Sequence, residues 1–284
     1  MRKQRLCLKK KKMARRRRKI KFKDLPKSAK ISKIITWVML LVGIGCLGYF
    51  VFYIRQADNT QDNYERISSL KNTYFTERKN KVVMRLDEKE EAPDILDDYV
   101  TIYNNNKSLV GWIKIDDTHV DYPVMQSSNE DYYLDHNFNQ EKDNNGSIFI
   151  DKDCSIWPRS QNIIIYGHNM KSGKMFGDLK KYKSEEYCKK NPYIYFDTLY
   201  EKGKYQVMYV FGDNIKDTSE VTFKYYQFID ANSVEEWDSA MQTMAEKSMY
   251  DTEITAPFGT QLITLSTCDY EKDAERFVVV ARKL

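Results

Sequence analysis

The stretch from Ile34 to Ile54, IITWVMLLVGIGCLGYFVFYI, contains 21 residues without a charge. At about 1.5 Å per residue, a helix of this length spans a hydrocarbon core of roughly 30 Å. Trp37 near one end and Tyr53 near the other suit the two membrane interfaces. A cleaved signal peptide is the alternative, but its apolar region would be shorter and no A-x-A-like site follows. The sequence therefore predicts an uncleaved signal-anchor helix over residues 34–54.

The charge of the chain differs sharply on the two sides of this stretch. Residues 1–33 hold 17 Lys and Arg against the single acid Asp24, a charge of +16, whereas the remainder carries −11. Positive flanks stay in the cytoplasm. The sequence therefore predicts a single-pass cell membrane protein with a cytoplasmic N-terminus and with residues 55–284 outside the cell. Attraction to anionic membrane lipids already accounts for a basic tail, which argues against nucleic acid as a partner.

The remainder divides into a polar segment and a folded domain. Residues 55–92 are polar and weakly helical, typical of an extracytoplasmic stalk. From residue 93 on, a short helical pattern over 93–106 is followed by apolar or alternating runs separated by turn residues. Eight such runs predict a mostly β domain closed into a small barrel, with peripheral helices over 174–190 and 233–249. The runs are 110–115, 120–126, 147–151, 162–168, 193–200, 204–212, 261–268 and 276–284.

Five cysteines occur, of which Cys154, Cys188 and Cys268 lie in the domain expected outside the membrane. Three cysteines cannot all pair, and no C-x-x-C spacing indicates zinc. A disulfide between Cys154 and Cys188 stays open. At least one exported thiol is therefore free, which calls for an explanation.

Three histidines limit the search for a general base. His119 lies in a polar turn and is expected to be exposed, and His136 lies among aromatic residues as a structural histidine. His168 follows the apolar run NIIIYG, so it sits at the end of a strand. A histidine there can cap the backbone or take part in chemistry.

Cys268 also ends an apolar strand, LITLST, and is followed at once by the charged residues DYEKD. Burial as a small hydrophobe is the alternative to a reactive thiol. Seven residues separate Cys268 from Arg276, so a hairpin between the last two strands would bring these residues side by side. A guanidinium can stabilise a tetrahedral oxyanion by its charge and its hydrogen-bond donors. An ion pair with Asp269, Asp273 or Glu275 at the end of the strand would also explain Arg276.

The motifs TLSTC (264–268), an arginine eight residues later, and YGHN (166–169) resemble the catalytic motifs of sortases, membrane-anchored cysteine transpeptidases of Gram-positive bacteria. The resemblance runs from about Leu96 to Leu284 and includes SLVGWIKIDDTHVDYPVMQ, YYLDHNF, GSIFID and MFGDLKKY. The serine within TLSTC, the helical residues before the barrel and the long helix after the sixth strand resemble class B. The resemblance implies a sortase-type eight-stranded β-barrel with N-terminal helices, which makes residues 93–284 the catalytic domain.

The resemblance also implies roles for three residues: Cys268 as nucleophile, His168 as general acid/base and Arg276 as oxyanion and substrate stabiliser. The implied reaction cleaves an NPxTx-like C-terminal sorting signal of secreted proteins after its threonine. The resulting acyl-thioester passes to an amino group of a peptidoglycan precursor of the lipid II type or of the nascent wall. A pilin-polymerising class B sortase is the nearest alternative.

Further substrate-binding residues are expected from the same resemblance. Thr267 precedes the nucleophile in the motif, and Asn129, Tyr133 and Leu134 resemble a segment near the class B substrate groove. No cofactor or metal is expected, because the acids of DEKEEAPD lack the spacing of a metal-binding loop.

Other classes of protein fit the order of residues less well. Papain-like hydrolases place the cysteine before the histidine, and L,D-transpeptidases set the two close together, unlike the hundred residues between His168 and Cys268. A membrane-tethered binding or assembly module with an incidental thiol is the non-enzymatic alternative.

Overall fold

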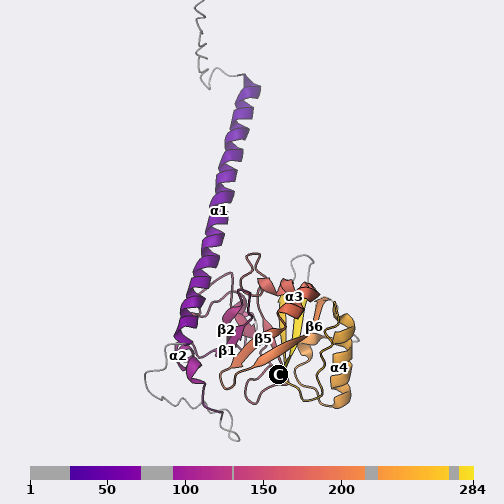
Figure 1. Cartoon of the computed structure of the whole chain (residues 1–284). Coiled ribbons are helices and arrows are strands. Elements are labelled where there is room, and N and C mark those ends of the chain that lie inside the picture. Colours follow the sequence, from indigo (N-terminus) through magenta and orange to yellow (C-terminus); the bar gives the residue numbers. More distant parts are fainter. Residues whose placement is uncertain (1–25, 72–91, 130, 215–222, 269–274) are drawn as a thin grey trace, which may run out of the picture. The chain divides into compact units, whose positions relative to one another are not determined.

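The computed structural model describes residues 26–71, 92–129, 131–214, 223–268 and 275–284 (Figure 1). Most of the predicted basic tail, the end of the predicted stalk and the loop after Cys268 lie outside these residues. The chain divides into two compact units, Met1–Arg55 and Gln56–Leu284. The helices are α1 (Lys27–Lys71), α2 (Asp97–Asn105), η2 (Tyr132–Leu134), η3 (Gly177–Lys183), α3 (Glu185–Lys190), η4 (Tyr225–Gln227) and α4 (Val234–Lys247).

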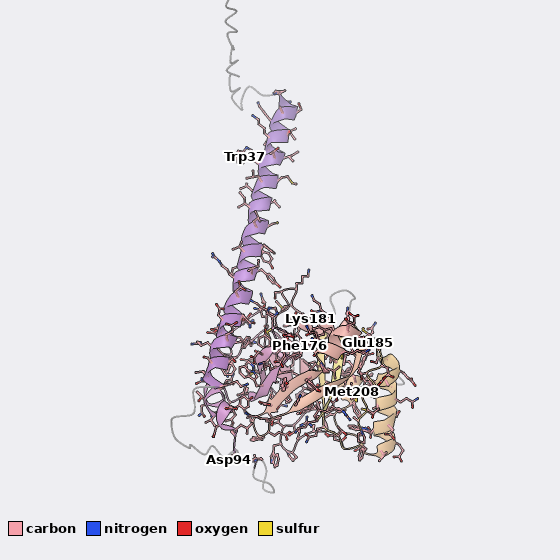
Figure 2. The ribbon with its side chains drawn as sticks, in the orientation of Figure 1. Trp37, Asp94, Phe176, Lys181, Glu185 and Met208 are labelled. Carbon is pink, nitrogen blue, oxygen red and sulfur yellow. The ribbon has the colours of Figure 1, made fainter. Side chains whose placement is uncertain are left out.

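In the first unit, α1 contains the apolar stretch of the sequence. Residues 27–55 form a helix that is long and apolar enough to cross a membrane by length and composition. Its large apolar side chains are exposed, as Figure 2 shows for Trp37. An apolar surface of this kind is unfavourable in water and suits a lipid environment.

Eight strands in the described residues of the second unit close into a barrel in the order β1-β2-β3-β4-β7-β8-β6-β5. The predicted strands and the predicted closure are confirmed. The strands are β1 (Leu109–Lys114), β2 (Asp121–Met125), β3 (Ile148–Ile150), β4 (Asn162–Tyr166), β5 (Tyr193–Thr198), β6 (Lys204–Asn214), β7 (Leu262–Cys268) and β8 (Glu275–Lys283).

The parallel pair β4 and β7 is buried along almost all of its described length. Its register runs from Asn162 opposite Leu262 to Tyr166 opposite Ser266. The side chains of residues 162–165 and 262–267 are buried without alternation. Burial without alternation is expected of parallel strands covered on both faces.

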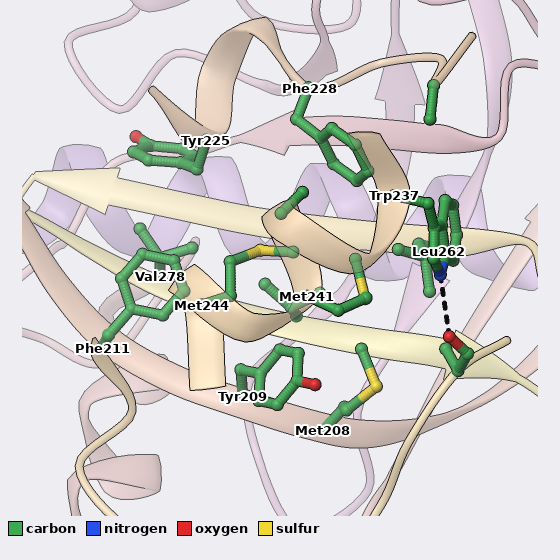
Figure 3. Close-up of a cluster of buried hydrophobic side chains, with 14 residues drawn as sticks. Met208, Tyr209, Phe211, Tyr225, Phe228, Trp237, Met241, Met244, Leu262 and Val278 are labelled. Atoms are coloured by element: carbon green, nitrogen blue, oxygen red, sulfur yellow. Dashed lines mark hydrogen bonds between the residues drawn. The ribbon is translucent and has the colours of Figure 1, made fainter. Parts of the chain in front are cut away.

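Helix α4 covers one side of the barrel and is the predicted long helix between the sixth and seventh strands. Ser233 caps its N-terminus by accepting from the Glu236 amide at 3.2 Å, while the Glu236 carboxylate accepts from the Asn232 amide at 2.8 Å. These two contacts satisfy amide groups at the start of the helix and resemble a capping box, with the return bond made to the residue before the cap. Trp237 packs into the apolar cluster beneath the helix and donates to the Ala256 carbonyl at 2.8 Å (Figure 3).

The C-terminal part of α1 packs against the barrel beside β1 and β2 (Figure 1). Tyr64 and Ile67 are buried, and the Tyr64 ring meets that of Tyr122 edge to face at 5.2 Å. Lys71 lies 4.5 Å from the centre of the Trp112 ring. The segment expected as a stalk is therefore helical up to Lys71, and its residues from Gln56 on belong to the second compact unit.

We expect Ile67→Ala to lower the free energy of unfolding of the second unit by about 2–4 kcal/mol, because it removes buried methyl groups and leaves a cavity. Urea unfolding of the detergent-solubilised chain, followed by tryptophan fluorescence, measures this change. Exposed Arg66 is the matched control on the same helix, and Arg66→Ala should change stability by less than about 0.5 kcal/mol. Equal effects of the two substitutions would contradict the packing of α1 against the barrel.

Candidate active site

Three strand ends meet at one rim of the barrel and bring the candidate residues together. The ladder between β4 and β7 ends at Tyr166 and Ser266, and the Gly167 amide continues it by donating to the Ser266 carbonyl at 3.2 Å. His168 and Cys268 therefore lie two residues beyond paired positions on neighbouring strands. Cys268 is paired with Arg276 across the antiparallel β7–β8 hairpin, as the sequence predicted.

A cleft of about 360 Å³ opens at this rim. Its walls come from the segment before β3, the ends of β3, β4 and β7, the turn η4 and the start of β8. The lining residues include Asp131, Leu134, Phe149, Asp151, Tyr166, Gly167, His168, Tyr225, Tyr226, Ser266, Thr267 and Arg276. The cleft thus combines two carboxylates, an imidazole, a guanidinium and four aromatic rings.

Four of the candidate residues line the cleft through described side chains: Leu134, His168, Thr267 and Arg276. His168 is half-buried, and its Nε2 lies 2.7 Å from the main-chain oxygen of Leu134. Thr267 is buried, and its Oγ1 has no hydrogen-bond partner among the described residues. The side chain of Cys268 lies outside the described part of the chain, so its position is given by the backbone pairing with Arg276.

The three residues predicted to line a substrate groove, Asn129, Tyr133 and Leu134, do not all reach the cleft. Leu134 lines the cleft and is 40% exposed. Tyr133 instead points into the core, where it is 1% exposed, and Asn129 is an exposed residue whose Oδ1 accepts from the Asp131 amide at 3.1 Å. Asp131 lines the cleft in their place.

An aromatic and acidic wall opposite this segment was not anticipated from the sequence. Phe149 and Tyr166 are register partners on β3 and β4, with ring centres 5.5 Å apart. Tyr166 donates to the Asp151 carboxylate at 2.9 Å. Burial and then the nearby Asp151 raise the pKa of Tyr166 above its ordinary value, which keeps this phenol protonated. Period-two alternation in SIFID is the signal that could have placed Phe149 and Asp151 on one face.

A second wall comes from turn η4, for which the sequence carried no strand or helix signal. Tyr225 and Ser266 are both buried, and their hydroxyl oxygens lie 2.7 Å apart. This contact ties the turn to β7 directly before the Thr267–Cys268 pair. Ser266 therefore has a structural partner that explains a hydroxyl at this position of the TLSTC motif.

The remaining thiols and histidines of the domain lie outside the cleft. Cys154 and Cys188 are both free and buried, so the disulfide left open by the sequence is not formed. His119 is half-exposed, and its Nδ1 lies 2.7 Å from the Asp178 carboxylate. His136 stacks on Tyr132 with ring centres 4.1 Å apart, as expected of a structural histidine.

The chemistry available at the rim follows from these residue types. A thiol can attack a carbonyl carbon, an imidazole can carry a proton to and from a leaving group, and a guanidinium can stabilise an oxyanion. Among the described residues, no group of three or more His, Cys, Asp or Glu could hold a metal ion.

Comparisons with known proteins agree on one family. Residues 113–284 match the family model described as the sortase domain. The chain is 34% identical over 183 residues to sortase B of Listeria monocytogenes, covering 64% of this chain and 72% of that protein. It is 27% identical over 251 residues to sortase B of Staphylococcus aureus, covering 87% of this chain and 95% of that protein.

Solved structures give the same result. A Staphylococcus aureus sortase B–substrate complex matches with a TM-score of 0.68 and 25% identity, covering 81% of this chain and 98% of that one. Sortase B from B. anthracis in complex with AAEK1 matches with a TM-score of 0.66 and 29% identity, covering 81% of this chain and 99% of that one.

We expect Cys154 to resist alkylation in the folded protein. Burial raises the pKa of its thiol to about 12, so at pH 7.5 the reactive thiolate is scarce and shielded. Iodoacetamide labelling followed by peptide mass spectrometry should be at least about 100-fold slower at Cys154 in the folded chain than in urea. Similar rates in the two conditions would show that this thiol is accessible.

We expect the Tyr225–Ser266 contact to give non-additive losses of stability. Either Tyr225→Phe or Ser266→Ala removes this buried contact and should lower the free energy of unfolding by about 1–3 kcal/mol. The double variant should lose less than the sum of the two single losses, because both hydroxyls are then absent. Urea unfolding of the four proteins gives this coupling, and strict additivity would contradict it.

Proposed function

The chain belongs to the class B sortases, which are cysteine transpeptidases, and on this premise we propose that it cleaves an NPxTx-like C-terminal sorting signal after the threonine and transfers the secreted protein to a peptidoglycan amine. In this proposal Cys268 is the nucleophile, His168 is the general acid/base, and Arg276 stabilises the oxyanion.

One observation carries the assignment of residues. The parallel pairing of β4 with β7 and the antiparallel pairing of β7 with β8 bring the backbones of His168, Cys268 and Arg276 to the same rim. His168 and Arg276 line the cleft there. Each residue alone could have a structural explanation. The convergence of all three at one rim instead supports a joint role.

The first half of the proposed reaction forms the acyl-enzyme. The Cys268 thiolate attacks the threonine carbonyl carbon, forming a C–S bond and a tetrahedral oxyanion beside the Arg276 guanidinium. The C–N bond then breaks, and protonated His168 gives its proton to the departing amine. The products are a thioester on Cys268 and the released C-terminal peptide.

The second half resolves the thioester. An amino group of a peptidoglycan precursor attacks the thioester carbonyl and loses a proton to His168, while the C–S bond breaks to regenerate the Cys268 thiolate. The Staphylococcus aureus sortase B–substrate complex supports a peptide signal as the first substrate. Phe149, Tyr166 and Leu134 are the apolar contacts that we propose for this peptide.

We further propose that residues 34–54 anchor the enzyme in the cell membrane, with the N-terminus in the cytoplasm and the catalytic unit outside. The apolar helix and the basic residues that precede it support this arrangement. In this arrangement the catalytic unit lies on the side of the membrane opposite the basic tail.

We expect Cys268→Ala to lower kcat/KM for fluorogenic NPxT-type peptides by about 10³-fold or more, because no nucleophile remains. Arg276→Lys should cost about 10²–10³-fold, because lysine cannot reproduce the planar guanidinium donors. Peptide cleavage and transfer to an added amine, followed by mass spectrometry, measure both steps.

Matched controls separate these roles from general damage. Arg282 lies on the same strand and donates to the Thr255 carbonyl, so Arg282→Lys should keep the activity within about twofold. The double variant Cys154→Ser, Cys188→Ser should likewise stay active. Cleavage by Cys268→Ala at the wild-type rate would sink the assignment of the nucleophile, and no cleavage by wild type across a library of sorting signals would sink the proposed reaction.

A further inference from the structure

The imidazole of His168 is held by a main-chain carbonyl. Its Nε2 lies 2.7 Å from the oxygen of Leu134. A carbonyl oxygen can only accept, so Nε2 must carry a proton and donate to it. The nitrogen that gains and loses a proton is then Nδ1, and the bond at Nε2 can persist in both protonation states.

The Leu134 carbonyl is fixed by main-chain bonds on either side of it. Leu134 is the last residue of turn η2. The Ser147 amide donates to the Tyr133 carbonyl at 2.9 Å, and the Asp143 amide donates to the Asp135 carbonyl at 2.9 Å. The turn that presents the carbonyl is thus bound to the segment 143–147, which leads into β3.

Gly146 lies directly behind this carbonyl. Its φ of +59° is in the left-handed region, which favours glycine. A Cβ at this position would lie 2.4 Å from the Tyr133 oxygen and 2.7 Å from the Leu134 oxygen. Both oxygens belong to the backbone, so a side chain at position 146 would have to displace turn η2.

Helix α1 anchors the same segment. The Tyr64 hydroxyl donates to the Gly146 carbonyl at 3.1 Å and lies 3.3 Å from Ser147 Oγ. Ser147 Oγ in turn donates to the His136 carbonyl at 2.9 Å. Tyr64 is 2% exposed, so this hydroxyl has been removed from water and placed on the segment that supports the turn.

We propose that the Leu134 main-chain carbonyl is the orienting group of His168, and that Gly146 and Tyr64 are positioning residues that hold this carbonyl in place. The inference rests on the proposed role of His168 as general acid/base. A ring held at Nε2 cannot flip as its other nitrogen exchanges a proton, which keeps one geometry through both halves of the reaction. The C-terminal part of α1 thereby supports the catalytic site from the opposite side of the turn.

Two substitutions test whether Gly146 and Tyr64 hold the Leu134 carbonyl in place, and each has a matched control. Gly146→Ala forces a Cβ against the Leu134 carbonyl. Gly259→Ala also places alanine at a positive φ, +88°, but no atom lies within 4 Å of a Cβ there. Tyr64→Phe removes a buried hydroxyl that donates to a carbonyl. Tyr182→Phe removes another such hydroxyl, which donates to the Asn191 carbonyl at 3.0 Å.

The direct readout is the Nε2 proton of His168. In the full-length chain, labelled with ¹⁵N-histidine in detergent micelles, wild type should show a slowly exchanging proton on Nε2, identified by its absence in His168→Asn. Gly146→Ala and Tyr64→Phe should lose this signal or exchange it at least about 10-fold faster, whereas both controls should keep it. A neutral wild-type His168 protonated at Nδ1 would overturn the proposal, as would unchanged exchange in Tyr64→Phe.

Kinetics give a second readout. Gly146→Ala should lower kcat/KM for the peptide by about 10-fold or more, since displacing turn η2 misplaces the imidazole and moves Leu134 in the cleft. Losses equal to those of Gly259→Ala would overturn the proposal. If Gly146→Ala does not fold, Tyr64→Phe decides the question. If wild type cleaves no peptide, the proposed function fails. The signal of the His168 Nε2 proton still tests whether the Leu134 carbonyl orients the imidazole.

Discussion

The parallel pairing of β4 with β7 is the contact on which the site depends. These strands are separated by about a hundred residues in the chain, yet their register places Tyr166 opposite Ser266 and so fixes the relation of His168 to Cys268. The pairing is stabilised by burial on both faces of the strands, because residues 162–165 and 262–267 are all removed from water. A slip of one residue would move every side chain to the opposite face, so the apolar core specifies the geometry of the rim.

The rim is supported from several directions by polar contacts that the core alone would not supply. Tyr225 holds turn η4 to β7, and Asp151 accepts from Tyr166 on the neighbouring strand. Each of these contacts joins segments that the barrel order brings together. Buried hydroxyls of this kind are costly when unpaired, which makes them effective at selecting one arrangement of a cleft wall.

The role of α1 changes the division of the chain into functional parts. A polar segment after an apolar helix is usually a spacer, but here Tyr64 and Ile67 enter the globular unit that begins at Gln56. The described side chains that make this packing include Tyr64, Ile67 and Lys71, which lie within a largely polar sequence. They contribute because the faces of β1 and β2 would otherwise expose rings such as Tyr122 and Trp112.

The strands of the barrel and the catalytic candidates can be read from the sequence, because both are encoded locally. Runs such as NIIIY and LITLSTC specify strands through β-branched residues, and YGHN and TLSTC mark their ends. The antiparallel partner of Cys268 was also accessible, since a short connection favours a hairpin with Arg276. The distant groups that surround these residues become visible in the folded chain alone. His168 contacts the main-chain carbonyl of Leu134, and Tyr64, more than a hundred residues from His168 in the chain, donates to the main-chain carbonyl of Gly146. Contacts to backbone atoms do not depend on the residue type that supplies them, so neither residue type nor spacing in the sequence predicts them.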